Sequence, residues 1–354
     1  MKEDTTIAVD IAKNVFEIAV SRRPGCVSER RRCSRAQMLT FFRNHPPVTV
    51  VLEACGAAHP LARELQGMGH QVRLLPPKHV RRYVLGNRTD RADATALLEA
   101  NRNEQILPVP VKTEAQQALS AVHRMRSGWL RTRTARLNMV RGILRELGVA
   151  IPVGARHVQP SVLAVLREAR VAAPLATLLM SVLSEILRLN ESIAESERQL
   201  KAIAQEMESV RRLETIPGIG LLTATALVAS VGEPSRFASG RRLSAFLGLV
   251  PREHSSGQTR RLGSITKRGD SYLRTLLTHG ARSILLAASR KRTKGSGLDR
   301  LQAWALELSE RRGHNRATVA LANKMARLAW AIWSRQDVYR PAAHSSVLLT
   351  TTIS

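Results

Sequence analysis

Cysteine, aromatic residues and acidic residues are all scarce in this chain of 354 residues. Three cysteines are too few for a disulfide framework or a four-cysteine zinc site, and they suit a reducing cytoplasm. Aromatic residues make up 3% of the chain, which argues against a platform on which single-stranded bases stack. No uninterrupted apolar run reaches the roughly 18 residues of a membrane span, and the first ten residues, MKEDTTIAVD, are too polar for a signal peptide. We therefore expect a cytoplasmic protein with no membrane partner.

The shortage of acids leaves a large positive charge. Lys and Arg number 55 against 28 Asp and Glu, which gives a net charge of +27 and a pI of about 11.5. Residues 216–354 hold 22 of these basic residues and 7 of the acids, so 22 − 7 = +15 of the excess lies there. A charge of this size usually meets nucleic acid, and arginine, the commoner cation here, suits phosphate contacts. We expect the last segment to contact phosphates.

The N-terminal part of the chain reads as an α/β domain. Apolar and β-branched runs predict strands at residues 5–10, 15–20, 48–52 and 71–75, and helices are expected at residues 35–44 and 58–68. Changes of composition divide the chain into an α/β domain (residues 1–110), a helical arm (111–213), a mainly helical domain (214–340) and a disordered tail (341–354).

Four carboxylates stand out in the first of these domains. Asp10 ends one predicted strand and Glu53 directly follows another, and Asp90 and Asp93 lie one helical turn apart at the start of a predicted helix. Carboxylates that converge at one edge of a sheet would form a site for Mg²⁺ and phosphodiester chemistry. Single residues also have simpler explanations: Asp90 as a helix cap, Asp93 as an acid facing the helix dipole, and Glu53 as a surface acid.

The middle segment is helical in pattern. Residues 114–147 are rich in arginine with apolar residues at three- and four-residue steps, and residues 175–213 repeat apolar residues in near-heptad fashion. Two such helices folded back on each other would form an antiparallel coiled coil, and an ordinary helical bundle is the alternative.

The last segment holds two further signals. Gly218 and Gly220 lie in an Ile-Pro-Gly-Ile-Gly turn before an apolar helix, which is typical of a helix-hairpin-helix that contacts phosphate through its backbone, or of a plain packing turn. Downstream, Ser255, Ser256 and Gly257 form a turn flanked by basic residues, which are Arg252, Arg260, Arg261, Lys267 and Arg268. Such a field would stabilise a pentavalent phosphorus, although a basic loop that only binds phosphate fits the same pattern.

Three segments of the first domain, IAVDIAKNVFEIAV, VVLEACG and NRTDRADATALLEA, resemble the DEDD-type transposases of bacterial insertion sequences. The likeness is to family one-ten and its eleven-eleven subgroup, to which the Piv/MooV DNA invertases are related. It implies a RuvC-like, ribonuclease-H-like fold whose metal-binding acids fall on Asp10, Glu53, Asp90 and Asp93. The segment GLVPREHSSGQTRRLGSITKRGDSYLRTLL resembles the family's C-terminal domain and implies a nucleophile at Ser256, with Ser255 as the competing choice.

The same resemblance implies a function and partners. It indicates a transposase that recombines donor and target DNA at specific sites, guided by a structured bridge RNA and assembled as a homodimer or homotetramer in the bacterial cytoplasm, at the nucleoid. Two alternatives remain open at this point. One is a RuvC-like endonuclease that uses the acids without a serine intermediate. The other is a non-catalytic basic protein that binds nucleic acid, although carboxylates facing phosphate would not help such a protein.

Overall fold

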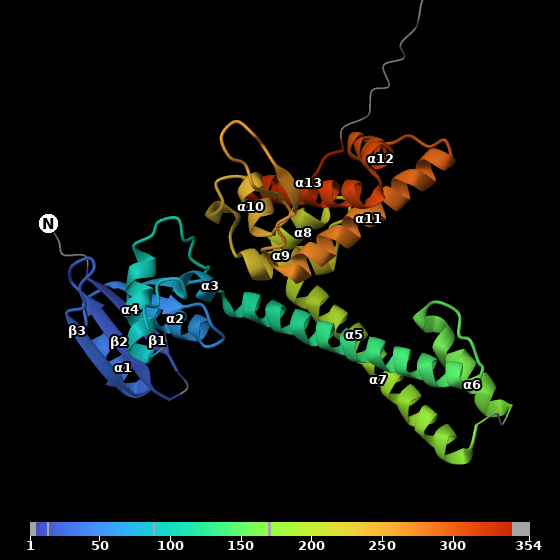
Figure 1. Cartoon of the computed structure of the whole chain (residues 1–354), viewed down its shortest axis with the longest axis horizontal. Coiled ribbons are helices and arrows are strands. Elements are labelled where there is room, and N and C mark those ends of the chain that lie inside the picture. Colours follow the sequence, from blue (N-terminus) through green and yellow to red (C-terminus); the bar gives the residue numbers. More distant parts are fainter. Residues whose placement is uncertain (1–4, 13, 88, 169–170, 342–354) are drawn as a thin grey trace, which may run out of the picture. The chain divides into compact units, whose positions relative to one another are not determined.

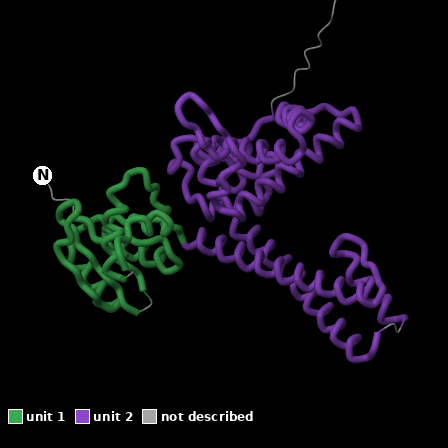
Figure 2. Tube along the Cα trace, viewed as in Figure 1, with its two compact units in different colours: residues 1–113 green, residues 114–354 purple. Residues whose placement is uncertain are grey.

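The computed structural model describes residues 5–12, 14–87, 89–168 and 171–341. The chain divides into two compact units, residues 1–113 and residues 114–354 (Figure 2). Apart from Pro341, the predicted tail lies outside the described residues. The predicted C-terminal domain falls within the second unit, as does the predicted arm apart from residues 111–113.

Unit 1 is an α/β domain, as the strand and helix patterns predict. Its elements follow in this order: β1 (Thr6–Ile11), β2 (Phe16–Ser21), β3 (Glu29–Cys33), α1 (Arg35–Arg43), β4 (Thr49–Glu53), α2 (Ala58–Gly67), β5 (Gln71–Leu75), α3 (Pro77–Val80) and α4 (Asp90–Asn101). The five strands form one sheet in the order β3-β2-β1-β4-β5. β2 pairs antiparallel with both β1 and β3, whereas β4 pairs parallel with both β1 and β5. The central strand is therefore β1.

Helices cover both faces of this sheet with different side chains. On one face, large residues such as Ile7, Val9 and Leu52 pack against α1 and α2. On the other face, Ala8 and Val51 pack with the apolar side of α4. Small residues on that face allow α4 to lie close to the strands, where it contacts β1, β2, β4 and β5. The start of α4 is thereby held close to the sheet.

The arm consists of α5 (Glu114–Glu146) and α7 (Ala173–Ala204), which are joined through a 3₁₀ turn (Ala155–His157) and α6 (Val158–Arg167). Two ion pairs show that α5 and α7 run antiparallel (Figure 1). Arg126 Nη2 lies 2.7 Å from Glu197, and Arg136 Nε lies 2.7 Å from Glu185, so residue numbers rise along α5 as they fall along α7. At the far end the two helices share an apolar core with α6.

Within the described residues, α7 is the one helix long and apolar enough to cross a membrane. A single helix of this kind is weak evidence for a membrane protein, because a helix that packs on its neighbours passes the same test. Leu179, Leu183 and Ile186 of α7 are buried against α5 and α6, whereas Leu178 and Leu187 of the same helix are exposed.

The rest of unit 2 is a helical domain with one small sheet. Its elements are α8 (Glu208–Glu214), α9 (Leu221–Val231), a 3₁₀ turn (Pro234–Arg236), α10 (Gly240–Phe246), β6 (Pro251–Glu253), β7 (Leu262–Ile265), α11 (Ser271–Thr293), α12 (Arg300–Arg312) and α13 (His314–Arg335). Leu119 of α5 and Leu200 of α7 join its apolar core, so the base of the arm is part of this domain. The helical run predicted over residues 175–213 is two helices, α7 and α8, with extended backbone at Met207 between them.

Candidate active site

Asp10 and Glu53 lie side by side at the carboxyl ends of two neighbouring parallel strands. β1 and β4 are paired in register up to Val9 and Leu52, so Asp10 and Glu53 are the next pair along. Side chains alternate between the two faces of a strand. Ala8 and Val51 pack on the α4 face, so Asp10 and Glu53, two residues further on, belong to that face as well. The strands therefore bring two carboxylates to the same edge and face of the sheet.

The start of α4 brings the other two acids to this face. Thr89 is the N-cap of α4, and its hydroxyl accepts a hydrogen bond of 3.2 Å from the Ala92 amide. Asp90 is consequently the first helical residue, and capping does not explain it. Asp93 follows one turn later, half-buried, whereas Asp90 is exposed.

The ionisation of Asp10 shows that the four acids act on one another. The pKa of the half-buried Asp10 is raised from its usual 3.8 to about 6, first because burial disfavours the charged form. The negative charges of Asp93, Asp90 and Glu53 raise the pKa further, in that order of size. Asp10 is thus the carboxylate on which the charges of the other three acids act.

The four acids could hold a divalent cation through their oxygens, and such an ion would offset this repulsion. In the part of the chain that the structure describes, however, no three or more His, Cys, Asp and Glu side chains are grouped closely enough to hold a metal ion together. The acids are therefore near enough to influence the pKa of Asp10 without forming a closed ligand set.

A fifth acid, Glu17, was not singled out by the sequence. It pairs with Asp10 across β1 and β2, and its side chain is buried. Arg91, between Asp90 and Asp93 in the sequence, places its Nε 4.0 Å from Glu17 Oε1. Arg30 of β3 donates to the Arg91 carbonyl and to the Thr95 hydroxyl. An acid inside the apolar run VFEIAV was the signal that could have drawn attention to Glu17.

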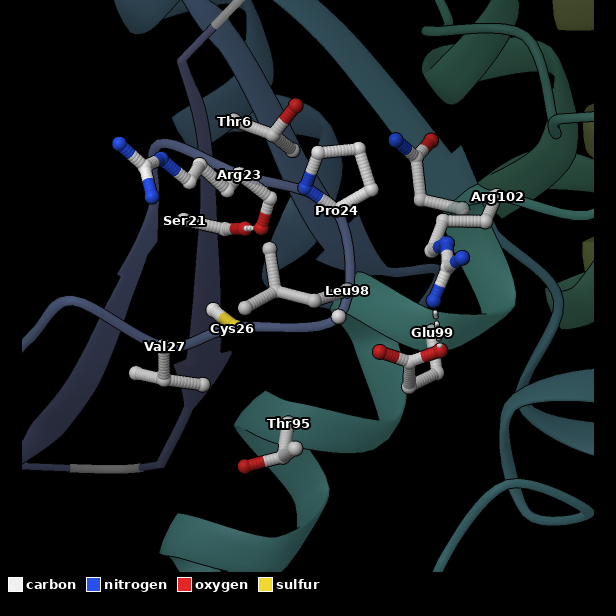
Figure 3. A pocket seen from close by; sticks show the side chains of 12 residues that line it. Thr6, Ser21, Arg23, Pro24, Cys26, Val27, Thr95, Leu98, Glu99 and Arg102 are labelled. Atoms are coloured by element: carbon white, nitrogen blue, oxygen red, sulfur yellow. Dashed lines mark hydrogen bonds and ion pairs between the residues drawn. The ribbon is translucent and has the colours of Figure 1, made fainter.

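A small pocket lies at the other end of the same sheet (Figure 3). It is lined by Thr6 at the start of β1, by Ser21 at the end of β2, and by Leu98 and Arg102 near the end of α4. Its volume is about 80 Å³, well below the several hundred cubic ångströms of a small-molecule site. The four acids do not line it, so it does not belong to the candidate active site.

The two serines lie on a β-hairpin in unit 2, which projects from the body of the unit beside α10 (Figure 1). β6 and β7 pair antiparallel, and Ser256 exchanges two backbone hydrogen bonds with Thr259, of 3.2 and 3.1 Å. Gly257 is the first residue of the resulting two-residue turn and has φ +55°, a conformation that favours glycine. The structure thus places Ser256 at the tip, where it is exposed.

The hydroxyls of the two serines have different surroundings. The Ser255 hydroxyl donates a hydrogen bond of 2.8 Å to Glu253 and accepts one of 3.2 Å from the Arg261 amide. Across the described ranges, the Ser256 hydroxyl makes no hydrogen bond. Ser255 therefore holds the hairpin together, whereas the Ser256 hydroxyl faces solvent.

The basic residues predicted to bind nucleic acid surround this hairpin. All five are exposed, and they are Arg252, Arg260, Arg261, Lys267 and Arg268. Arg260 Nε lies 3.5 Å from Glu253 Oε1. The hairpin base is anchored by Gly248, since a Cβ there would lie 2.7 Å from the Arg268 amide.

The two predicted backbone contacts at Gly218 and Gly220 differ in their surroundings. Gly218 lies between α8 and α9 with φ +78°, and a Cβ there would lie 2.7 Å from the Gly280 carbonyl of α11. Its lack of a side chain therefore has a packing reason. Gly220 is exposed at the N-cap of α9, with open space around it.

Comparison with known proteins finds transposase families that match most of the chain. A DEDD-type transposase model of the IS110 group matches residues 7–149, which include the four acids. A model described as Transposase IS116/IS110/IS902 family matches residues 210–295, which include the hairpin.

Several relatives match over most of their length. A probable family 20 transposase of Pseudomonas aeruginosa is 43% identical over 341 residues, which cover 95% of this chain and 98% of the relative. The transposase for insertion sequence element IS1111A of Coxiella burnetii is 41% identical and covers 97% of this chain and 93% of its own. The pilin gene-inverting protein of Moraxella bovis is 23% identical over 77% of this chain and 80% of its own.

These matches confirm the family resemblance that the three N-terminal segments and the serine segment carry. DEDD-type transposases are ribonuclease-H-like at their N-terminus, use divalent metal ions and act on DNA. The chain belongs to the IS110 family of insertion-sequence transposases, and it is a DNA recombinase.

Proposed function

We propose that this transposase exchanges DNA strands through a covalent bond to Ser256, with Mg²⁺ at Asp10, Glu53, Asp90 and Asp93. The observation that carries the proposal is the gathering of four carboxylates around Asp10, whose pKa is raised to about 6 by burial and by the other three charges. In a chain of net charge +27 that acts on DNA, acids crowded in this way are costly unless a cation is bound between them.

The oxygen ligands fit Mg²⁺, which prefers carboxylates and phosphate oxygens. When bound, the ion supplies charge stabilisation to the scissile phosphate and lowers the pKa of an attacking hydroxyl or water. The chain's own part is to hold the four carboxylates at one sheet edge, two on strands and two on a helix. Rigid elements of this kind keep ligands in place better than loops do.

Ser256 supplies the second half of the chemistry. Its oxygen attacks phosphorus, so that an Oγ–P bond forms while the P–O bond to one strand end breaks. The proton that Ser256 loses is balanced by the proton that the departing sugar oxygen takes up. The cations beside the hairpin, among them Arg261 and Arg268, would stabilise the additional negative charge on the pentavalent phosphorus. Attack by a second strand end on the phosphoserine then restores a phosphodiester and frees the serine.

Guidance by a bridge RNA is the second part of the proposal. A net charge of +27 is compatible with two nucleic-acid partners, and the 3% of aromatic residues leaves little surface for stacking on bases. A protein that leaves base reading to a guide needs mainly backbone contacts. Sequencing of RNA that copurifies with the protein tests this point. We expect a structured RNA encoded beside the gene, and recovery of only random cellular RNA would contradict guidance.

The serine assignment is tested with a matched pair of substitutions. We expect Ser256→Ala to abolish both strand exchange and the covalent protein–DNA product seen on a denaturing gel. Ser255→Ala removes the two hydrogen bonds that this hydroxyl makes within the hairpin, and it is expected to lower activity several-fold while retaining that product. If Ser255→Ala alone abolishes the product, the nucleophile is Ser255.

The same experiment separates this mechanism from that of a RuvC-like endonuclease. Such an enzyme would cut DNA to free ends, without a covalent product, and would tolerate Ser256→Ala. Asp10→Asn should abolish strand exchange under the proposed mechanism, or DNA cleavage under the endonuclease mechanism, while leaving DNA binding nearly intact. Strand exchange at the wild-type rate in Asp10→Asn would exclude the metal site. Assembly as a homodimer or homotetramer stays a prediction, and light scattering with and without nucleic acid measures it.

A further inference from the structure

A basic cavity lies between α10 and α13 of unit 2, distinct from the hairpin that carries Ser256. Its volume is about 520 Å³. Three cations line it: Arg241 from α10, and Lys324 and Arg327, one turn apart on α13. Among the residues that the structure describes, no acid lines it.

The walls of this cavity are fixed by close packing. Gly240 lies directly on α13, since a Cβ there would be 3.0 Å from both the Cα and the carbonyl oxygen of Arg327. The Trp330 indole Nε1 donates to the carbonyls of Pro234 and Phe237, at 3.1 and 3.0 Å. Buried Ser244 of α10 donates to the Asn323 carbonyl of α13. The cations therefore project from a rigid frame rather than from a loop.

The cations of the cavity differ from those of the arm in what surrounds them. Over the residues that the structure describes, none of Arg241, Lys324 and Arg327 has a carboxylate within 4.0 Å. This contrasts with Arg126 and Arg136 of the arm, which each pair with a glutamate. Lys324 lies over the Trp304 ring instead, with Nζ 4.0 Å from the ring centre.

The crowding of like charges has a cost. The pKa of Lys324 is lowered, first by burial and then by the positive charges of Arg300 and Arg327. Cations held together on rigid helices without a counter-charge are a ready site for an anion with several charges. Guanidinium groups, two of which line the cavity, bind phosphate through paired hydrogen bonds.

We infer that the α10–α13 cavity binds consecutive phosphates of a nucleic-acid backbone, as a site separate from the catalytic hairpin. The inference depends on the chain's action on DNA and not on the serine or the metal of the proposed mechanism. Its ligand chemistry is the phosphodiester group, which either DNA or the proposed guide RNA supplies.

The experiment measures the affinity of the full-length protein for a fluorescein-labelled DNA duplex and for an RNA duplex of the same sequence. Binding is followed by anisotropy in EDTA over a KCl series from about 50 to 200 mM. EDTA removes any part that a metal plays, so the result does not depend on the active site. The test variant is Lys324→Gln/Arg327→Gln. The control variant, Arg212→Gln/Arg292→Gln, removes the same charge from unit 2, but from arginines already paired with Glu208 and Glu310.

We expect the test variant to make the negative slope of the log association constant against log[KCl] shallower by about 1.8 for DNA, because each lost phosphate contact removes about 0.9 from its magnitude. The control should leave the slope nearly unchanged. A loss of slope with the RNA duplex alone would identify RNA as the occupant, and a loss with the DNA duplex alone would identify DNA.

A second variant shows whether a change of slope is caused by misfolding of the first. Arg241→Gln/Arg327→Gln removes two cations of the same cavity and keeps the contact between Lys324 and Trp304, and it should give the same loss of slope. Equal slopes for the wild type and for both test variants, with both nucleic acids, would overturn the inference. If Ser256→Ala loses strand exchange but binds both duplexes as the wild type does, the inference about the α10–α13 cavity still holds.

Discussion

Asp10→Asn should stabilise unit 1 when no metal is present, although Asp10 is expected to be essential for activity. The pKa of Asp10 rises from 3.8 to about 6 on folding, so the carboxylate is less favourable in the folded chain than in the unfolded one. A pKa difference of one between the folded and the unfolded chain corresponds to about 1.4 kcal/mol, so the stabilisation by Asp10→Asn has an upper limit of about 3 kcal/mol. Because the side chain is only half-buried, solvent screening reduces the expected gain to about 1–2 kcal/mol.

The sign of this effect depends on pH in a defined way. Unfolded Asp10 loses its proton near pH 4, whereas folded Asp10 keeps it until about pH 6. The destabilisation therefore grows between these values and is complete above them. Asparagine resembles the protonated acid, so the variant should gain stability at pH 7.5 and should gain nothing at pH 3.5.

The assay must report on unit 1 alone. All four tryptophans, at positions 129, 304, 330 and 333, lie in unit 2, so tryptophan fluorescence does not follow the sheet. Hydrogen exchange of peptides from β1 and β4, with calorimetry in EDTA, measures the relevant unfolding. A gain of 1–2 kcal/mol should raise the melting temperature of unit 1 by roughly 5 °C or more. Glu104→Gln, at an exposed acid of the same unit, is the charge-matched control and should change little.

The same stability measurements are repeated with Mg²⁺ in place of EDTA. Added Mg²⁺ should stabilise the wild-type unit through preferential binding to the folded state, and it should stabilise Asp10→Asn much less. If Asp10→Asn is no more stable than the wild type in EDTA at pH 7.5, the repulsion between the four acids is absent and the reasoning fails. A gain of the same size at pH 3.5 would likewise refute it, because the cause would then be packing.

Two further predictions concern the stability of unit 2. Buried His123 bonds to the hydroxyls of Tyr272 and Thr225, both at 2.9 Å, and burial lowers its pKa to about 4. Unfolded histidine takes up a proton near pH 6.5, so the free energy of unfolding of unit 2 should fall by about 2 kcal/mol between pH 7.5 and 5. Urea unfolding followed by tryptophan fluorescence should show this fall in the wild type and not in His123→Gln. Gly280→Ala would place a Cβ 2.1 Å from the Gly218 carbonyl and should cost at least about 3 kcal/mol in the same assay, whereas Gly297→Ala, in open space, should not. An unchanged urea midpoint in Gly280→Ala would contradict this packing.

The strands that pack against the core could be predicted from the sequence, and those on the surface could not. Continuous apolar runs such as residues 48–52 indicate a buried strand directly. β3 has the sequence ERRRC and lies at the edge of the sheet, where one neighbour is enough and no apolar alternation is required. The exposed hairpin of β6 and β7 was expected only as a polar turn for the same reason.

The four acids could be singled out from the sequence because each lies at the end of a strand or at the start of a helix. Asp10 is the last residue but one of β1, Glu53 ends β4, and Asp90 and Asp93 lie in the first turn of α4. Parallel pairing of β1 with β4 then brings their ends together. The contact between Glu17 and Arg91 depends on the crossing of α4 over β2, which no local pattern indicates.

The α10–α13 cavity lay beyond sequence reasoning, because Arg241 and Lys324 are more than eighty positions apart and single basic residues are common in this chain. The structure gives the net charge of +27 a more specific meaning. At Asp10 burial and then three negative charges raise the pKa, and at Lys324 burial and then two positive charges lower it. Each arrangement costs stability in the free protein, and each is relieved by a ligand of the opposite sign. On this argument the crowded acids indicate a metal ion, and the crowded cations indicate a phosphodiester backbone.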